Sequence, residues 1–142
     1  MADLRVFLDA NILFTAAYSP DGLSPLLIEL GAAGRVTLLT SPLAIVEAER
    51  NFEAKRPAAL PTLRRSLTAV RVVREAAPAD VERLTPPELS SKDRPLLAVA
   101  IVAHATHFVT GDVAHFGRWI NRRARLPLRV MTPRQFLTEV HP

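Results

Sequence analysis

The stretch KDRPLLAVAIVAHATHFVTGDVAHF, residues 92–116, decides the fold. Its first part, residues 92–105, is mostly apolar and carries Pro95 where a first helical turn tolerates proline, so it predicts a buried helix. Residues 106–111 form a short apolar run that predicts a buried strand, and Asp112 follows it directly. A helix that leads into a buried strand is part of a βαβ unit. The stretch therefore indicates a parallel sheet.

The rest of the chain repeats this alternation. Four further apolar runs predict strands at 5–9, 35–40, 70–73 and 128–132, and helices are expected at 10–18, 21–34, 41–56, 57–70, 78–84 and 133–140. Ser24 and Ser41 each precede a proline and are predicted N-caps. We therefore expect one domain over residues 1–142, with the α/β fold of a three-layer α/β/α sandwich around a parallel sheet of about five strands.

Composition excludes several classes of protein. The chain has 142 residues, of which 49% are hydrophobic and 23% charged, as in ordinary globular domains. It has no cysteine, which excludes disulfides, thiolate metal sites and cysteine nucleophiles. The N-terminus carries Asp3 and Asp9 where a signal peptide would be basic, and no apolar run reaches the length of about 20 residues that a membrane span needs. We expect a cytoplasmic protein without a membrane segment.

Positive charge is concentrated in the last third of the chain. The net charge is +4, and residues 94–142 contain seven arginines but only two acidic residues. Guanidinium groups bind phosphate oxygens well, so this segment is a candidate RNA-binding surface. The residues that we expect to carry it are Arg118, Arg122, Arg123 and Arg125. The alternative is a solvated arginine-rich surface without a ligand.

Four acidic residues have positions that allow them to converge. Asp9 ends the first predicted strand and Asp112 follows the fourth, and the carboxyl ends of parallel strands share one edge of a sheet. Glu47 and Asp93 lie on predicted helices. Converging carboxylates repel one another, and a divalent cation would relieve that repulsion. Oxygen ligands without cysteine favour Mg²⁺ or Mn²⁺.

The histidines of the same region raise the question of a histidine metal site. His104, His107 and His115 lie close together in the sequence, but no pair has the i, i+4 spacing of a helical metal site. We therefore expect the histidines in surface or packing roles. Phe116 and Trp119 are likewise expected to pack in the interior.

Four segments in this order resemble the motifs of the PIN domain. They are FLDANIL (7–13), TSPLAIVEAERN (40–51), residues 92–116 and MTPRQFL (131–137), so the resemblance covers nearly the whole chain. More narrowly, they resemble the small bacterial PIN proteins that are related to the toxins of VapBC-type toxin–antitoxin pairs.

The resemblance implies a metal-dependent ribonuclease. The family's acidic positions match Asp9, Glu47, Asp93 and Asp112, which would be both catalytic residues and ligands of Mg²⁺ or Mn²⁺, with Glu47 acting directly or through water. Asn11, Ser41 and Thr110 would support that site. The resemblance also implies an RNA substrate, a small antitoxin as partner and a homodimer.

Three alternatives remain open at this point. The first is a housekeeping PIN nuclease of RNA processing or decay, and the second is a PIN-like module that binds RNA without cleaving it. The third is a haloacid-dehalogenase-like phosphatase, which also begins with a strand ending in Asp. That chemistry uses a second Asp two positions later, and this chain has Asn11 there.

Overall fold

A computed structural model describes residues 3–120 and 126–140. The strands are β1 (Arg5–Leu8), β2 (Thr37–Thr40), β3 (Val70–Val72), β4 (His107–Val109) and β5 (Arg129–Met131). The helices are α1 (Ala10–Tyr18), α2 (Ser24–Ala32), α3 (Pro42–Lys55), the 3-10 helix η1 (Pro57–Ala59), α4 (Leu60–Leu67), α5 (Pro78–Leu84), α6 (Arg94–Val102), α7 (Val113–Phe116) and α8 (Pro133–Val140).

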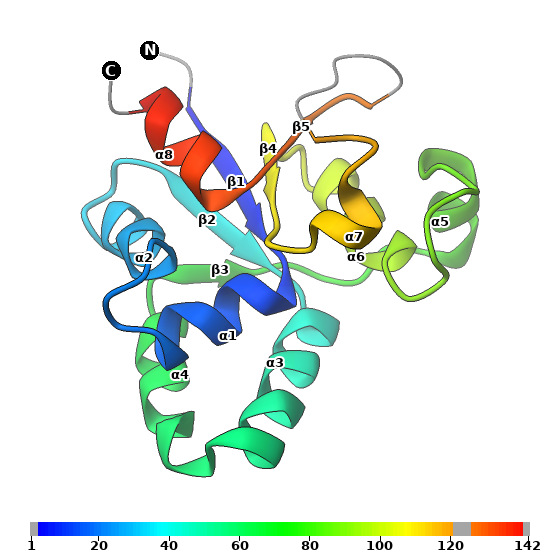
Figure 1. The fold of residues 1–142 in the computed structure, drawn as a ribbon. Coiled ribbons are helices and arrows are strands. Elements are labelled where there is room, and N and C mark those ends of the chain that lie inside the picture. Colours follow the sequence, from blue (N-terminus) through cyan, green and yellow to red (C-terminus); the bar gives the residue numbers. More distant parts are fainter. Residues whose placement is uncertain (1–2, 121–125, 141–142) are drawn as a thin grey trace.

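The five strands form one sheet in the order β3-β2-β1-β4-β5, and every neighbouring pair is parallel. Helices α1 to α4 lie on one side of the sheet and α5 to α7 on the other (Figure 1). This arrangement confirms the predicted α/β fold with a five-stranded parallel sheet between helices. Because β1 and β4 are parallel neighbours at the centre of the sheet, the residues that directly follow these two strands lie side by side.

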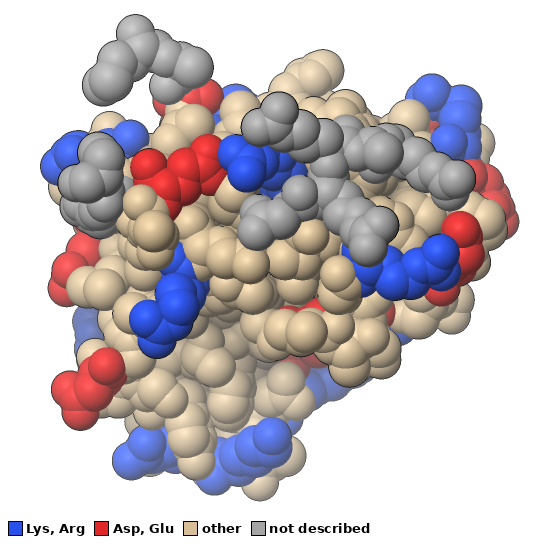
Figure 2. Space-filling model, turned by 45° about the horizontal axis from the view of Figure 1, so that its top comes forward, with Lys and Arg blue, Asp and Glu red and all other residues tan. Residues whose placement is uncertain are grey.

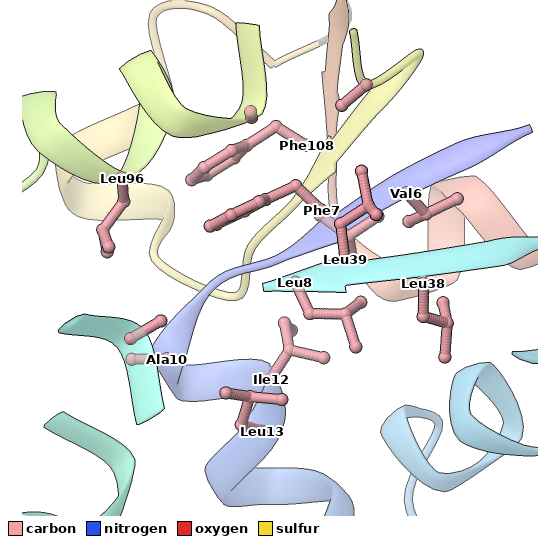
Figure 3. Packing of buried hydrophobic residues seen from close by; sticks show 14 of the residues in the cluster. Val6, Phe7, Leu8, Ala10, Ile12, Leu13, Leu38, Leu39, Leu96 and Phe108 are labelled. Atoms are coloured by element: carbon pink, nitrogen blue, oxygen red, sulfur yellow. The ribbon is translucent and has the colours of Figure 1, made fainter. Parts of the chain in front are cut away.

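The core explains why β1 reads as a continuous apolar run. Val6, Phe7 and Leu8 are fully buried, since helices cover both faces of the sheet. Phe7 stacks on Phe108 of β4, with ring centroids 5.4 Å apart and planes 9° apart, on the side of α6. Leu8 points the opposite way, toward Ile12 of α1 (Figure 3). Side chains of successive strand residues alternate between the faces, as the pleat requires.

Some local predictions were wrong. Ser24 is not the N-cap of α2: Leu23 holds that position, and the Ser24 hydroxyl lies 2.7 Å from Thr15 Oγ1 of α1. The prediction for Ser41 is confirmed, because its Oγ accepts a hydrogen bond from the Ala44 N–H at the start of α3. The short helix α7 was not expected. Within the described residues, no helix has the length and apolar character needed to cross a membrane.

Candidate metal centre

Asp9 stands at the carboxyl end of β1 and begins α1. It is buried, and its Oδ1 accepts a hydrogen bond of 2.8 Å from the Ala10 N–H as the N-cap of the helix. Its Oδ2 accepts hydrogen bonds from Thr110 Oγ1 at 2.7 Å and from Asn11 Nδ2 at 3.0 Å. The carboxylate is therefore held in one orientation by the ends of two adjacent strands.

Asn11 and Thr110 join the start of α1 to the segment after β4. The Gly111 N–H donates to Asn11 Oδ1 at 2.8 Å, and the Asp112 N–H donates to Thr110 Oγ1 at 3.0 Å. A Cβ at Gly111 would lie 3.3 Å from Asn11 Oδ1, so glycine leaves room for this close approach. Through these contacts, two of the three predicted supporting residues, Asn11 and Thr110, fix Asp9 and the backbone at Asp112.

Asp93 and Asp112 occupy the N-cap positions of helices on the opposite side of the sheet from α1. Asp93 is the buried N-cap residue of α6, and its Oδ2 accepts a hydrogen bond of 2.6 Å from Ser90 Oγ. Asp112 is the N-cap of α7, and its Oδ1 accepts from the His115 N–H at 3.0 Å. Negative charge at both positions is favoured by the partial positive charge of a helix start.

His115 lies on the surface, as expected, but its ring also contacts these two acids, a contact that was not predicted. Its Nδ1 is 3.1 Å from Asp93 Oδ2 and 2.7 Å from Asp112 Oδ2, while the ring stays half exposed. Asp93, Asp112 and His115 each offer one ligand atom, and these atoms all lie within 4.8 Å of one another. Of the other two histidines, His107 is buried against Phe136 and His104 is exposed.

Glu47 lies on α3 and contacts Lys92, a residue that was not among the predicted site residues. Its Oε1 forms an ion pair with the Nζ of Lys92. Among the described residues, the group of three metal-ligand side chains includes neither Glu47 nor Asp9. Ser41 is fully buried and caps α3, so it positions the helix that carries Glu47.

The electrostatics place Asp9 near Asp93 and Glu47. Burial raises the pKa of Asp9 to about 6, although the hydrogen bonds from Thr110 and Ala10 lower it. The negative charges of Asp93 and Glu47 raise the pKa of Asp9 further, which places both within electrostatic reach.

The donor set suits a divalent cation. Two carboxylates and an imidazole converge, and a third carboxylate is buried nearby with its charged form disfavoured. A cation would lower the repulsion among the carboxylates and would favour the ionised form of Asp9. The residues present therefore fit the metal that the PIN resemblance implies.

Of the four predicted RNA-binding arginines, one lies within the residues that the structure describes. Arg118 is exposed, and its guanidinium carbon is 5.5 Å from the ring centroid of Trp119. Arg122, Arg123 and Arg125 lie outside the described residues. On the face seen in Figure 2, the coloured Lys and Arg residues form separate groups with acidic residues between them. This view gives no added support to a continuous basic surface among the described residues.

Solved structures share this fold at low sequence identity. VapBC2 from Rickettsia felis, crystallised with a DNA fragment from its promoter, has a TM-score of 0.68 at 17% identity, covering 91% of this chain and 98% of that one. PAE2754 from Pyrobaculum aerophilum has a TM-score of 0.65 at 18% identity, with coverage of 96% and 89%. VapC20 from Mycobacterium tuberculosis, a toxin that cleaves the sarcin–ricin loop, has a TM-score of 0.57 at 16% identity, with coverage of 87% and 98%.

No curated protein sequence matches the chain significantly. The sequence does match the PIN domain family over residues 5–114. This range includes all four predicted acidic positions, and His115 lies one residue beyond it. The match covers well over half of the chain, and its fold resembles that of VapC toxins. The chain therefore belongs to the PIN domain family.

Proposed function

We propose that this protein is a divalent-metal-dependent endoribonuclease that hydrolyses RNA phosphodiester bonds. One observation carries the proposal: in a PIN domain, Asp93, Asp112 and His115 place their ligand atoms within 4.8 Å of one another, beside the carboxyl end of the central strand. Ligands of open α/β sheets bind at that edge. Its RNA substrate would place the protein in the cytoplasm.

Asp93 and Asp112 would hold the metal ion, Mg²⁺ or Mn²⁺. Asp9 would join them directly, and Glu47 would contribute directly or through water. When bound, such an ion neutralises charge on phosphate oxygens and activates water.

The chain's own residues would position the carboxylates, accept a proton and bind the RNA. Thr110 and Asn11 hold Asp9 in a fixed orientation, Ser90 does the same for Asp93, and Ser41 fixes the start of the helix that carries Glu47. One of the carboxylates would accept the proton of the attacking water. Arg118, together with Arg122, Arg123 and Arg125, would bind the RNA backbone with an affinity that depends on salt but little on sequence.

His115 is a further ligand in this proposal, and an imidazole favours Mn²⁺ over Mg²⁺. We expect the Mn²⁺-loaded protein to show ¹⁴N coupling from a histidine in pulsed electron paramagnetic resonance. His115→Gln should abolish that coupling and weaken Mn²⁺ binding about tenfold. His104→Gln, which changes an exposed histidine, is the control and should leave both unchanged. Unchanged ¹⁴N coupling in His115→Gln would show that His115 is not a ligand.

We also propose that the nuclease is the toxin of a VapBC-like pair and that it binds a small antitoxin. Supporting this partner, a largely apolar groove of about 670 Å³ lies between α3, α5 and α6. Its lining includes the half-exposed Leu43 and Val46, which precede Glu47 on α3. A partner segment with apolar side chains followed by a basic one would suit both the groove and the acids beside it. The homodimer stays a prediction.

The experiment that tests the function is RNA cleavage by the purified protein after removal of metal with EDTA. We expect cleavage to return when Mn²⁺ or Mg²⁺ is added, with 5′-phosphate and 3′-hydroxyl ends as products. A module that only binds RNA would give no products under either condition. A phosphatase would release phosphate from p-nitrophenyl phosphate instead of cutting RNA.

A further inference from the structure

Lys92 connects two parts of the acidic site that are distant in sequence. It directly precedes Asp93 at the start of α6, and its Nζ forms an ion pair with Glu47 of α3. The Lys92 side chain is 71% exposed, whereas that of Glu47 is 27% exposed. The ammonium group is thus held at the solvent side of the acids, where an RNA phosphate would approach.

The candidate metal ligands near Lys92 fall into two groups, of which one can bind an ion and the other is paired with the lysine. Asp93, Asp112 and His115 can bind one ion together, and within the described residues Glu47 lies outside that group. Glu47 already has a cation, the ammonium of Lys92. The carboxylate of Asp9 is within electrostatic reach of both Asp93 and Glu47, and its Oδ2 accepts hydrogen bonds from Thr110 and Asn11.

Negative charges surround Lys92. Glu47 is paired with its ammonium group, and the carboxylates of Asp93 and Asp9 also attract that group. Three of the four acids thus act on one ammonium group, as they would act on a metal ion.

We propose that Lys92 supplies the second positive charge of this site: its ammonium group, paired with Glu47, keeps a second divalent ion from binding to that carboxylate. The chain then binds one divalent ion, at Asp93, Asp112 and His115 with Asp9 beside them, and Glu47, which is paired with Lys92, contributes to that ion only through water. The proposal rests on the metal-dependent nuclease function proposed above. An ammonium group has three N–H donors, and Glu47 uses one. The remaining donors of Lys92 can bind a phosphoryl oxygen of the RNA.

The stoichiometry of Mn²⁺ binding, measured by calorimetry without RNA, tests this proposal. We expect one ion per chain in the wild-type protein and in Lys92→Arg, which keeps the charge. Lys92→Met frees Glu47, so it should bind two ions, the second more weakly. Lys55→Met removes the other lysine of the chain, at the far end of α3, and should bind one ion. Circular dichroism would check that each variant is folded.

Two results would overturn the proposal: two ions in the wild-type protein, or a single ion in folded Lys92→Met. Either result leaves the nuclease function standing, because an ion is still bound. Absence of Mn²⁺ binding in all four proteins would overturn the nuclease function together with this proposal. Weaker RNA binding in Lys92→Met than in Lys55→Met, measured without metal, is expected from the phosphate contact.

Discussion

The Asp93→Asn variant is expected to lose RNA cleavage by more than about 100-fold while it keeps its fold. Asp93 is buried, and one of its oxygens is a ligand atom of the group formed with Asp112 and His115. Asparagine removes the charge that attracts a cation but keeps an oxygen that can accept the hydrogen bond from Ser90. The contact with Ser90 and the turn before α6 should therefore survive.

This prediction is measured as an initial rate of RNA cleavage at saturating Mn²⁺, with a thermal melt of the same sample. The matched control is Asp21→Asn, which changes an exposed aspartate and should cleave at the wild-type rate. Expression of the wild-type protein in bacteria should arrest growth if it is a toxin, whereas Asp93→Asn should permit growth. Cleavage by Asp93→Asn at the wild-type rate would remove Asp93 from the site.

The second large effect concerns Asp9 and the dependence of stability on pH. The pKa of Asp9 is about 6 in the folded protein, against 3.8 for the ordinary side chain. Between these values the folded state binds more protons than the unfolded state, so the free energy of unfolding falls as pH rises from about 4 to about 6. Above about pH 6 the loss in the free energy of unfolding stays constant at about 3 kcal/mol.

Asp9→Asn removes this titration. Relative to the wild-type protein, the metal-free variant should gain stability between pH 4 and pH 7.5, by on the order of 10 °C in Tm. Added Mn²⁺ should reduce or reverse this difference in stability. At pH 7.5 the ion binds to the ionised site of the wild-type protein and stabilises it, whereas it stabilises Asp9→Asn much less. Asp21→Asn is again the control. Parallel pH profiles for the wild-type protein and Asp9→Asn would contradict the raised pKa.

The sheet was predictable because its strands are buried on both faces. Residues 5–9 and 106–111 read as apolar runs that end in polar residues, and such runs indicate central parallel strands. Helix boundaries were less accurate. The predicted N-cap at Ser24 was wrong, because its hydroxyl bonds to Thr15 of a neighbouring helix instead of its own first turn. Tertiary contacts of this kind have no local signal in the sequence.

The candidate site was predictable only where strand ends place the residues. Asp9, Thr110 and Asp112 follow from the rule that carboxyl ends of parallel strands share an edge. His115 was not predicted as a ligand because no two histidines of this stretch have the i, i+4 spacing of a helical metal site. Asp112 and His115 are three apart on a short helix, and that spacing puts them on one face. The contact from Lys92 to Glu47 joins the turn before α6 to α3, and nothing in the spacing of these residues indicates it.

The most direct test of the central claim measures Mn²⁺ binding and RNA cleavage on one preparation. Metal-free protein is titrated with Mn²⁺, and bound ion and cleavage rate are recorded at each step. If the acidic site binds the catalytic ion, both curves rise with the same midpoint, and both are lost in Asp93→Asn. Cleavage that is complete before Mn²⁺ binds, or that persists in EDTA and in Asp93→Asn, would contradict a metal-dependent nuclease at this site.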